Sequence, residues 1–417
     1  MPTNRIAEGI AFGDCGDASR EKPLIIFCEE CGRKHEIRCP QGCGHEALLA
    51  CDSCEETLKV PDTAAAIAAP AEAPIRLMIV DDSRLIRTVV RQMFDADEQV
   101  RVVGEAADGR EALQLLPEVA PDVITLDIKM PEMDGLSTLK HIMIKRPTPT
   151  VMISALTRDG ATETFDALRF GAIDFMPKPS QREAASLEDQ KRRIKRKVKL
   201  AAGIKMDNVR LLRTRPPNGG APAIAIERCV VLGASEGGYG ALLKIIPQLD
   251  PAWPAAYLAV LYAAEAHLAA FVNYLDANSS LRVRRAADGM PLEAGTCYLA
   301  SGREYVTAVQ DGERTGLRVH PSPFPGRRGA INMLMLSLSE VMGARTVAVV
   351  LTGKDADGAE GAAEIARIGG EVLIQDPQTC LFKEMALSAL RLCRSGRSLN
   401  DSEIAPAIKT LFNNQHR

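Results

Sequence analysis

The segment IRLMIVDD, at residues 75–82 of this 417-residue chain, indicates the fold of the region around it. It is an apolar run that ends in two acids. Similar runs at 123–127 and 150–154 end in Asp127 and Ser154. Each run is typical of a buried parallel strand with a polar residue at its carboxyl end. Helical patterns fill the gaps, so the order predicts a doubly wound α/β sheet whose strands converge with their carboxyl ends at one edge.

The side chains expected at that edge suit a phosphoryl group. Asp81, Asp82 and Asp127 would place three carboxylates together, and the usual remedy for their repulsion is a hard divalent cation such as Mg²⁺. Lys178, which follows one more short strand, offers an ammonium group for a carboxylate or a phosphoryl oxygen, and Ser154 offers a hydroxyl. The alternative is that the acids only cap helices, but their order at successive strand ends favours a site.

Residues 75–182 resemble a response-regulator receiver domain, which has a flavodoxin-like sheet. The resemblance implies an acid that accepts phosphate from a histidine kinase and two further acids that help to bind Mg²⁺. It also implies a hydroxyl and an aromatic ring that move toward the phosphorylated acid, and a lysine. In that order, these roles fall on Asp127, Asp81, Asp82, Ser154, Phe175 and Lys178. The resemblance also implies a cis peptide between Lys178 and Pro179.

Length and composition are typical of a modular cytoplasmic protein. A chain of 417 residues suggests two or three domains. Glu265 and His267 interrupt its longest apolar region, and no amino-terminal stretch resembles a signal peptide, so we expect no membrane span. The formal net charge of -3 gives no nucleic-acid signature, so nucleic acid is not an expected partner. A basic run at 191–197 is interpreted as the solvated face of a linker helix, with attraction to an acidic partner or a phosphate backbone as the alternative.

Cysteine is concentrated near the amino terminus, where seven of the eleven cysteines lie before residue 60. Two pairs, Cys28 with Cys31 and Cys51 with Cys54, have the spacing that lets four thiolates surround one Zn²⁺ ion. Residues 1–60 therefore resemble a small zinc ribbon whose folding depends on the metal. The alternatives are disulfides, or a different or second set of zinc ligands. The residues that could provide such a set are His35, Cys39, Cys43 and His45.

A second parallel α/β pattern follows from Glu227 onward. The strand at 229–232 runs into GASEGG at 233–238, and glycines around Ser235 permit the sharp strand-to-helix turn that presents a nucleophile. A later apolar strand at 348–351 leads to Asp357. Together with the receiver-like segment upstream, this part of the chain resembles the catalytic domain of the CheB family, the chemotaxis protein-glutamate methylesterases.

That family uses a Ser, His, Asp triad to hydrolyse methyl esters of chemoreceptor glutamates, and many members also deamidate receptor glutamines. By position, Ser235 and Asp357 match the serine and the aspartate, whereas Tyr262 stands where the family has its histidine. Three neighbouring positions also depart from the family. They are Glu236 in place of threonine, Lys354 in place of methionine and Asp355 in place of glycine.

A tyrosine, with a reference pKa of about 10, is a poor base for a serine at neutral pH. Because the loss of a triad base costs several orders of magnitude in rate, we expect a weak or inactive esterase that acts by binding a partner such as a chemoreceptor. In that case the charged residues around Ser235 could form an inert salt-bridged cluster. The alternative is an active methylesterase or glutamine amidase with a relocated base, for which His267 and His320 are available.

The sequence therefore predicts two doubly wound parallel-sheet domains behind a zinc-ribbon-like module. The expected boundaries are 1–60 for that module, 61–74 for a flexible linker, 75–182 for the receiver domain, 183–226 for a basic helical linker and 227–417 for the CheB-type domain.

Overall fold

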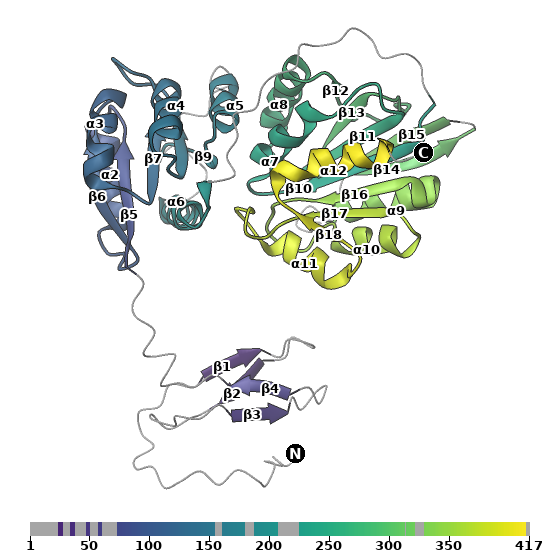
Figure 1. Cartoon of the computed structure of the whole chain (residues 1–417), viewed down its shortest axis with the longest axis horizontal. Coiled ribbons are helices and arrows are strands. Elements are labelled where there is room, and N and C mark those ends of the chain that lie inside the picture. The colour runs from purple at the N-terminus through teal and green to yellow at the C-terminus, as the bar shows by residue number, and fades with distance from the viewer. Residues whose placement is uncertain are drawn as a thin grey trace. The chain divides into compact units, whose positions relative to one another are not determined.

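The computed structural model divides the chain into two compact units, Met1–Ala73 and Pro74–Arg417 (Figure 1). The structure describes residues 24–27, 34–37, 47–50, 57–60, 73–154, 161–179, 187–206, 225–312, 314–321 and 329–413.

The first unit contains two pairs of antiparallel strands. β1 (Leu24–Phe27) pairs with β2 (Lys34–Ile37), and β3 (Ala47–Ala50) pairs with β4 (Thr57–Val60). In the sequence, each CxxC pair falls between the two strands of one such pair. The predicted zinc ligands lie outside the described residues, so the zinc ribbon stays a prediction. These ligands are Cys28, Cys31, Cys51 and Cys54, with Cys39, Cys43, His45 and the side chain of His35 as the alternatives.

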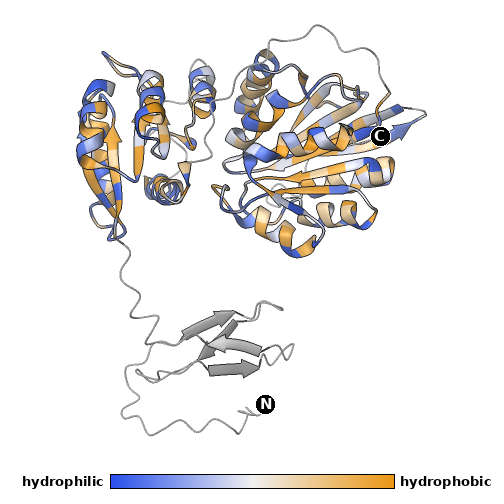
Figure 2. Ribbon diagram, viewed as in Figure 1, coloured by the Kyte–Doolittle hydropathy of each residue, from blue (hydrophilic) through white to orange (hydrophobic). Residues whose placement is uncertain are grey.

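The second unit begins with a five-stranded parallel sheet in the order β6-β5-β7-β8-β9. Its strands are β5 (Ile75–Val80), β6 (Val100–Ala106), β7 (Val123–Asp127), β8 (Thr150–Ser154) and β9 (Asp174–Pro177). Its helices are α2 (Arg84–Phe94), α3 (Gly109–Val119), α4 (Gly135–Lys145) and α5 (Ala161–Arg169). Every residue of β7 is buried, and Figure 2 shows apolar residues concentrated along these strands. The doubly wound sheet is confirmed.

The helices of this domain begin where the sequence supplies side-chain caps. Ser83 caps α2 by accepting the backbone N–H of Ile86, and Asp134 caps α4 by accepting that of Ser137. These caps fix the turns that follow β5 and β7. The Lys178–Pro179 peptide is trans, contrary to the expectation from the family. An X–Pro bond prefers trans by about 0.5–1 kcal/mol unless tertiary contacts reverse that preference.

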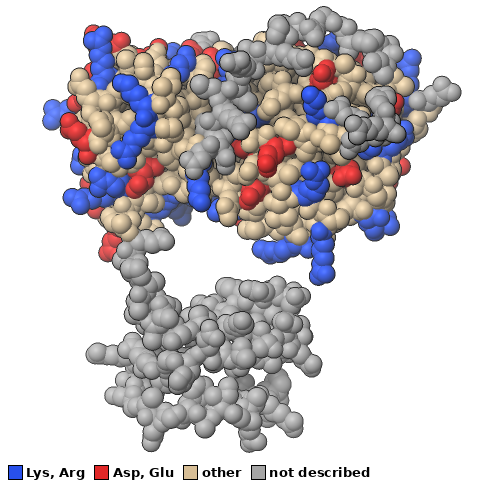
Figure 3. Space-filling model, viewed as in Figure 1, with Lys and Arg blue, Asp and Glu red and all other residues tan. Residues whose placement is uncertain are grey.

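The basic run lies on α6 (Leu187–Ala202), which packs against the receiver sheet. Its apolar side Ile194, Val198 and Ala201 is buried in one core cluster with residues of β5 and β8. Its lysines form ion pairs with receiver acids: Lys195 and Lys199 with Asp97, and Lys197 with Asp174. Charges of both signs are interspersed on the described face in Figure 3. Lys195 and Lys197 of the basic run are thus paired with acids of their own chain, whereas Arg192 and Arg193 are exposed.

The carboxyl-terminal domain is built on a seven-stranded parallel sheet in the order β12-β13-β11-β10-β16-β17-β18. The strands are β10 (Arg228–Ala234), β11 (Ala255–Leu261), β12 (Arg282–Arg285), β13 (Thr296–Ser301), β16 (Thr346–Val350), β17 (Glu371–Gln375) and β18 (Arg397–Leu399), and a separate antiparallel pair is formed by β14 (Glu304–Asp311) and β15 (Arg314–Pro321). The helices are α7 (Gly238–Ile245), α8 (Glu265–Asn278), α9 (Ala330–Met342), α10 (Ala359–Arg367), α11 (Glu384–Leu392) and α12 (Asp401–Asn413). This second parallel-sheet domain is also confirmed.

The two parallel-sheet domains share one apolar core cluster. The ring of Phe165 in α5 lies 5.0 Å from that of Phe271 in α8, and the ring of Phe175 in β9 lies 5.4 Å from that of Tyr239 in α7. Aromatic pairs at such separations add to the stability that area burial supplies. Every helix among the described residues is too short or too polar to cross a membrane.

Candidate functional site

Three strands of the receiver sheet bring acidic and basic side chains together at one edge. Asp81 follows β5, Asp127 ends β7, and Lys178 follows β9. The Nζ atom of Lys178 lies 2.8 Å from Oδ2 of Asp127 and 2.9 Å from Oδ2 of Asp81. Both acids are buried, with exposed fractions of 2% for Asp81 and 3% for Asp127. The lysine therefore supplies the positive charge that two buried carboxylates require.

The electrostatics of this edge follow from burial and pairing. Burial raises the pKa of Asp127 above its ordinary value, and the hydrogen bond from Lys178 opposes that rise only in part. Burial lowers the pKa of Lys178, but its hydrogen bonds to Asp127 and Asp81 outweigh that effect and leave the pKa raised. The ammonium group is therefore held in its charged form beside the two acids.

The donor set at this edge fits a hard divalent cation. One oxygen each from Asp81, Asp82 and Asp127 lies within 4.8 Å of the others. A single ion could reach all three, and carboxylate oxygens together with water are the ligands that Mg²⁺ prefers.

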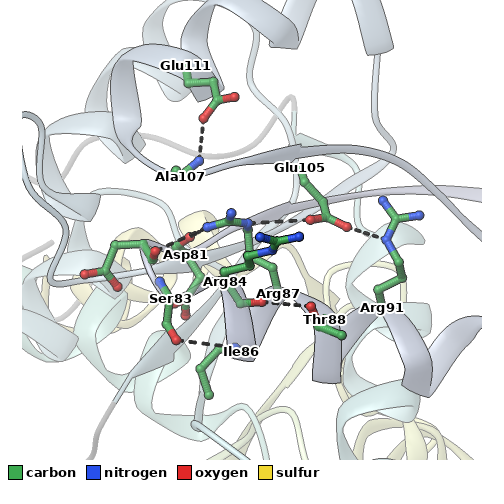
Figure 4. A network of polar contacts seen from close by, with 11 residues as sticks. Asp81, Ser83, Arg84, Ile86, Arg87, Thr88, Arg91, Glu105, Ala107 and Glu111 are labelled. Atoms are coloured by element: carbon green, nitrogen blue, oxygen red, sulfur yellow. Dashed lines mark hydrogen bonds and ion pairs between the residues drawn. The ribbon is translucent and has the colours of Figure 1, made fainter.

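A network of polar contacts fixes the turn that carries Asp81 and Asp82 (Figure 4). The guanidinium of Arg87 donates to the backbone carbonyl oxygen of Asp81 at 2.7 Å and to that of Asp82 at 3.3 Å. Its Nε atom lies 3.5 Å from a carboxylate oxygen of Glu105, which also pairs with Arg91. Sequence reasoning missed Arg87. Its place one turn into the helix that Ser83 caps is the signal that could have found it.

The two remaining residues predicted for the receiver site, Ser154 and Phe175, belong to strands β8 and β9. Ser154 ends β8 and pairs in register with Pro177 of β9, while its side chain lies outside the described part of the structure. Phe175 packs on Tyr239, so the predicted moving aromatic touches the helix that follows Ser235.

In the carboxyl-terminal domain, Ser235 lies on a tight turn between β10 and α7. Gly237 has a φ of 79°, a left-handed conformation that favours glycine. At Gly238, a Cβ atom would lie 2.7 Å from the Cβ of Ala234, so only glycine lets the helix begin this close to the strand. The turn has the form of the strand-to-helix elbow that the sequence predicted for a nucleophile.

The hydroxyl of Ser235 contacts the next residue and a second loop. Its Oγ atom donates to Oε2 of Glu236 at 2.7 Å and accepts the backbone N–H of Lys354 at 3.0 Å. A Cβ atom at Gly353 would lie 2.7 Å from that oxygen, so glycine leaves the space that the hydroxyl occupies. Ser235 is 2% exposed.

Asp357 takes part in different contacts, which centre on Tyr262. The Tyr262 hydroxyl donates to Oδ2 of Asp357 at 2.6 Å and accepts the backbone N–H groups of Gly329 at 3.0 Å and Ala330 at 3.3 Å. Asp357 also accepts the N–H groups of Ile331 and Asn332, both at 3.0 Å. Burial, followed by the nearby charge of Asp357, raises the pKa of Tyr262 well above its ordinary value. The phenol therefore keeps its proton at neutral pH.

The other departures from the family pattern have a local explanation in part. Asp355 has a φ of 85°, where the family has a glycine, and its Oδ1 atom accepts the N–H of Asp357 at 2.9 Å. Aspartate tolerates this region better than most residues because its side chain can bond locally. His267 lies in the first turn of α8, and His320 is exposed on β15. Neither histidine takes part in the Ser235 contacts given above.

Comparison with known proteins agrees with this two-domain arrangement. The response regulator receiver domain family matches residues 77–187, and the CheB methylesterase family matches residues 230–408. A Pyrococcus abyssi protein named protein-glutamate methylesterase/protein-glutamine glutaminase is 37% identical over 322 residues, which are 76% of this chain and 88% of that protein. A Symbiobacterium thermophilum protein of the same name is 35% identical over 352 residues, which are 81% of this chain and 97% of that protein.

Two solved structures match the domains separately. The CheB methylesterase catalytic domain of Thermotoga maritima is 26% identical, with a TM-score of 0.42, and the match covers 44% of this chain and 98% of that one. The response regulator domain of Thermotoga maritima CheB is 40% identical, with a TM-score of 0.29, and the match covers 32% of this chain and 98% of that one.

A receiver domain joined to an α/β domain with a serine elbow defines the class of response regulators that carry a hydrolase-type effector domain. Within that class, the extent and identity of the matches show that this chain belongs to the CheB family.

Proposed function

We propose that this protein is a phosphorylation-controlled response regulator of chemotaxis-type signalling that hydrolyses side-chain methyl esters or amides of chemoreceptors through Ser235. The observation that carries the hydrolase function is the elbow itself, where the Ser235 hydroxyl donates to a carboxylate at 2.7 Å. The names of the relatives support it, because they favour an active enzyme over the impaired one expected from the sequence.

Asp127 would be the phosphoacceptor, with a histidine kinase as the donor. Asp127 and Asp81 are both within 2.9 Å of Lys178, whose ammonium can pair with the added phosphoryl oxygens. Asp81, Asp82 and Asp127 would hold Mg²⁺, which would supply further positive charge for the transferred group. The Arg87 contacts support this role, because they fix the backbone that carries Asp81 and Asp82.

Control of the effector domain by phosphorylation is supported by the shared core between the domains. Phe175 lies three residues before Lys178 and packs against Tyr239, which lies four residues after Ser235. A displacement of the Phe175 ring would therefore change the packing of α7 (Gly238–Ile245), which begins three residues after the nucleophile. Such a coupled aromatic pair is a physical contact through which one site could bias the other.

A second candidate function is binding of a receptor without hydrolysis. The contact between Tyr262 and Asp357 favours it, because that aspartate is held by a phenol that keeps its proton. In either case, the first unit would bind Zn²⁺ through Cys28, Cys31, Cys51 and Cys54 and add a contact for partners.

The test is release of methanol from methylated chemoreceptor by the full-length protein, with and without acetyl phosphate and Mg²⁺. We expect turnover that rises on phosphorylation and is lost in Ser235→Ala. Turnover that is absent from the unmodified protein under both conditions would favour the binding function instead.

A further inference from the structure

The geometry around Ser235 raises the question of which group accepts its proton. A serine hydroxyl needs a base within about 2.6–3.2 Å, either directly or through one water. The Oγ atom donates to Oε2 of Glu236 at 2.7 Å, which is within that range. The backbone N–H of Lys354 donates to the same oxygen at 3.0 Å and helps to fix the direction of the O–H group.

The residue at the family's histidine position is poorly suited to this task. The Tyr262 hydroxyl donates to Asp357, so its own proton is directed away from the role of an acceptor. Its oxygen already accepts two backbone N–H groups, from Gly329 and Ala330. These contacts give Tyr262 a structural role, in which it joins β11 to the turn before α9.

We infer that Glu236 is the general base for Ser235, a role that rests on the proposed hydrolase function. The carboxylate is held by its position in the chain, directly after the nucleophile and on the same elbow. Glu236 is partly exposed, whereas Ser235 is buried, so the base can also reach a water molecule from the solvent side.

The proposed reaction with a glutamyl methyl ester balances in two steps. Glu236 takes the proton of Ser235 as Oγ bonds to the ester carbonyl carbon, and the C–OCH₃ bond then breaks as Glu236 gives that proton to the leaving methoxide. The products are methanol and an acyl-serine. In the second step Glu236 takes a proton from water, the hydroxide adds to the acyl carbon, and the proton returns to Ser235 as its bond to carbon breaks.

Charge balance also favours this assignment over a bystander role. A glutamate that stayed ionised beside Ser235 would oppose the negative charge that develops on the carbonyl oxygen. A glutamate that has just accepted a proton is neutral when that charge appears, so the repulsion is removed. The amino terminus of α7 then provides the positive end of a helix dipole for the oxyanion.

The test compares Glu236→Gln with the unmodified protein in the methanol-release assay, using full-length phosphorylated protein and methylated chemoreceptor. Glutamine can still accept the hydrogen bond from Ser235, but it cannot take the proton. We expect turnover to fall by about 10²–10⁴-fold, the usual contribution of a general base. Glu340→Gln, an exposed acid on α9, is the matched control and should leave turnover unchanged.

Thermal melting shows whether Glu236→Gln is folded, and Glu236→Thr, which restores the family residue, provides a second variant that should be equally slow. Turnover within threefold of the unmodified protein in either folded variant would overturn the role of Glu236 but leave the hydrolase function standing. An unmodified protein without turnover dependent on Ser235 would overturn both.

Discussion

The receiver domain and the carboxyl-terminal domain place their sites at the same kind of sheet edge but hold them differently. At the receiver edge, Lys178 lies between Asp81 and Asp127 and pairs with both. At the other edge, Asp357 accepts a hydrogen bond from the Tyr262 hydroxyl, and Glu236 accepts one from the Ser235 hydroxyl. The parallel sheet therefore determines where polar side chains come together. The identity of each side chain determines which of them form ion pairs and which form hydrogen bonds.

The largest expected effect tests the receiver side of this comparison. Asp127→Asn should abolish phosphorylation by acetyl phosphate and Mg²⁺, because Asp127 alone ends the central strand β7 beside Lys178. Intact-mass spectrometry should show one added phosphoryl group on the unmodified protein and none on the variant. Asp95→Asn, an exposed acid after α2, should still accept one. Stoichiometric phosphorylation of Asp127→Asn would show that another residue is the phosphoacceptor.

The next effect concerns the first unit, Met1–Ala73. If Cys28, Cys31, Cys51 and Cys54 bind Zn²⁺, a chelator should unfold that unit and leave the two parallel-sheet domains folded. Metal analysis under reducing conditions should find one Zn²⁺ per chain, and hydrogen exchange should show protection lost only before residue 61. Protein that contains no Zn²⁺ would contradict this prediction, and binding that survives replacement of Cys51 and Cys54 would shift the site to Cys39 and Cys43.

The receiver domain could be predicted closely from the sequence because its polar residues follow continuous apolar strands. Asp81, Asp82 and Asp127 lie where the strand pattern placed them, and one carboxylate oxygen of each lies within 4.8 Å of the others. The packing of α6 on this sheet could not be predicted in the same way. Its seven-residue basic run dominates the local sequence, whereas Ile194 and Val198 are recognisable as a buried side only once the sheet is known.

The carboxyl-terminal site was predictable in position but not in its bonds. The glycines around Ser235 indicated the elbow, and the motif placed Tyr262 where the family has histidine. The pattern could not show that Tyr262 forms a hydrogen bond with Asp357, because that contact joins the segment after β11 to the segment after β16, and β10 lies between these two strands in the sheet. Nor could it show that the Ser235 hydroxyl donates a hydrogen bond to the Glu236 carboxylate, because that contact depends on the side-chain rotamers.

A smaller effect tests whether Tyr262 is structural at its edge. Tyr262→Phe keeps the ring but leaves the N–H groups of Gly329 and Ala330 without their acceptor and removes one donor from Asp357. Buried groups left without partners cost about 1–3 kcal/mol, so the free energy of unfolding in urea should fall by that amount.

The matched control for this substitution is Tyr239→Phe. Among the described residues, the buried hydroxyl of Tyr239 has no hydrogen-bond partner, so its removal should leave stability unchanged or slightly raised. Equal losses in the two variants would show that the hydrogen bonds of the Tyr262 hydroxyl do not stabilise the domain.

The smallest effect is expected at the position where the family has its histidine. Tyr262→His restores the family residue, yet turnover should change by less than about tenfold, which corresponds to about 1.4 kcal/mol. The Ser235 proton is already directed at Glu236, and the neighbouring Lys354 and Asp355 remain foreign to the family pattern. In the double variant Tyr262→His with Glu236→Thr, turnover should depend on the introduced histidine, because triad groups act as a non-additive unit. A rise of a hundredfold or more in the single variant would show that a histidine at position 262 can act as the base for Ser235. That result would contradict the role of Glu236 as the base.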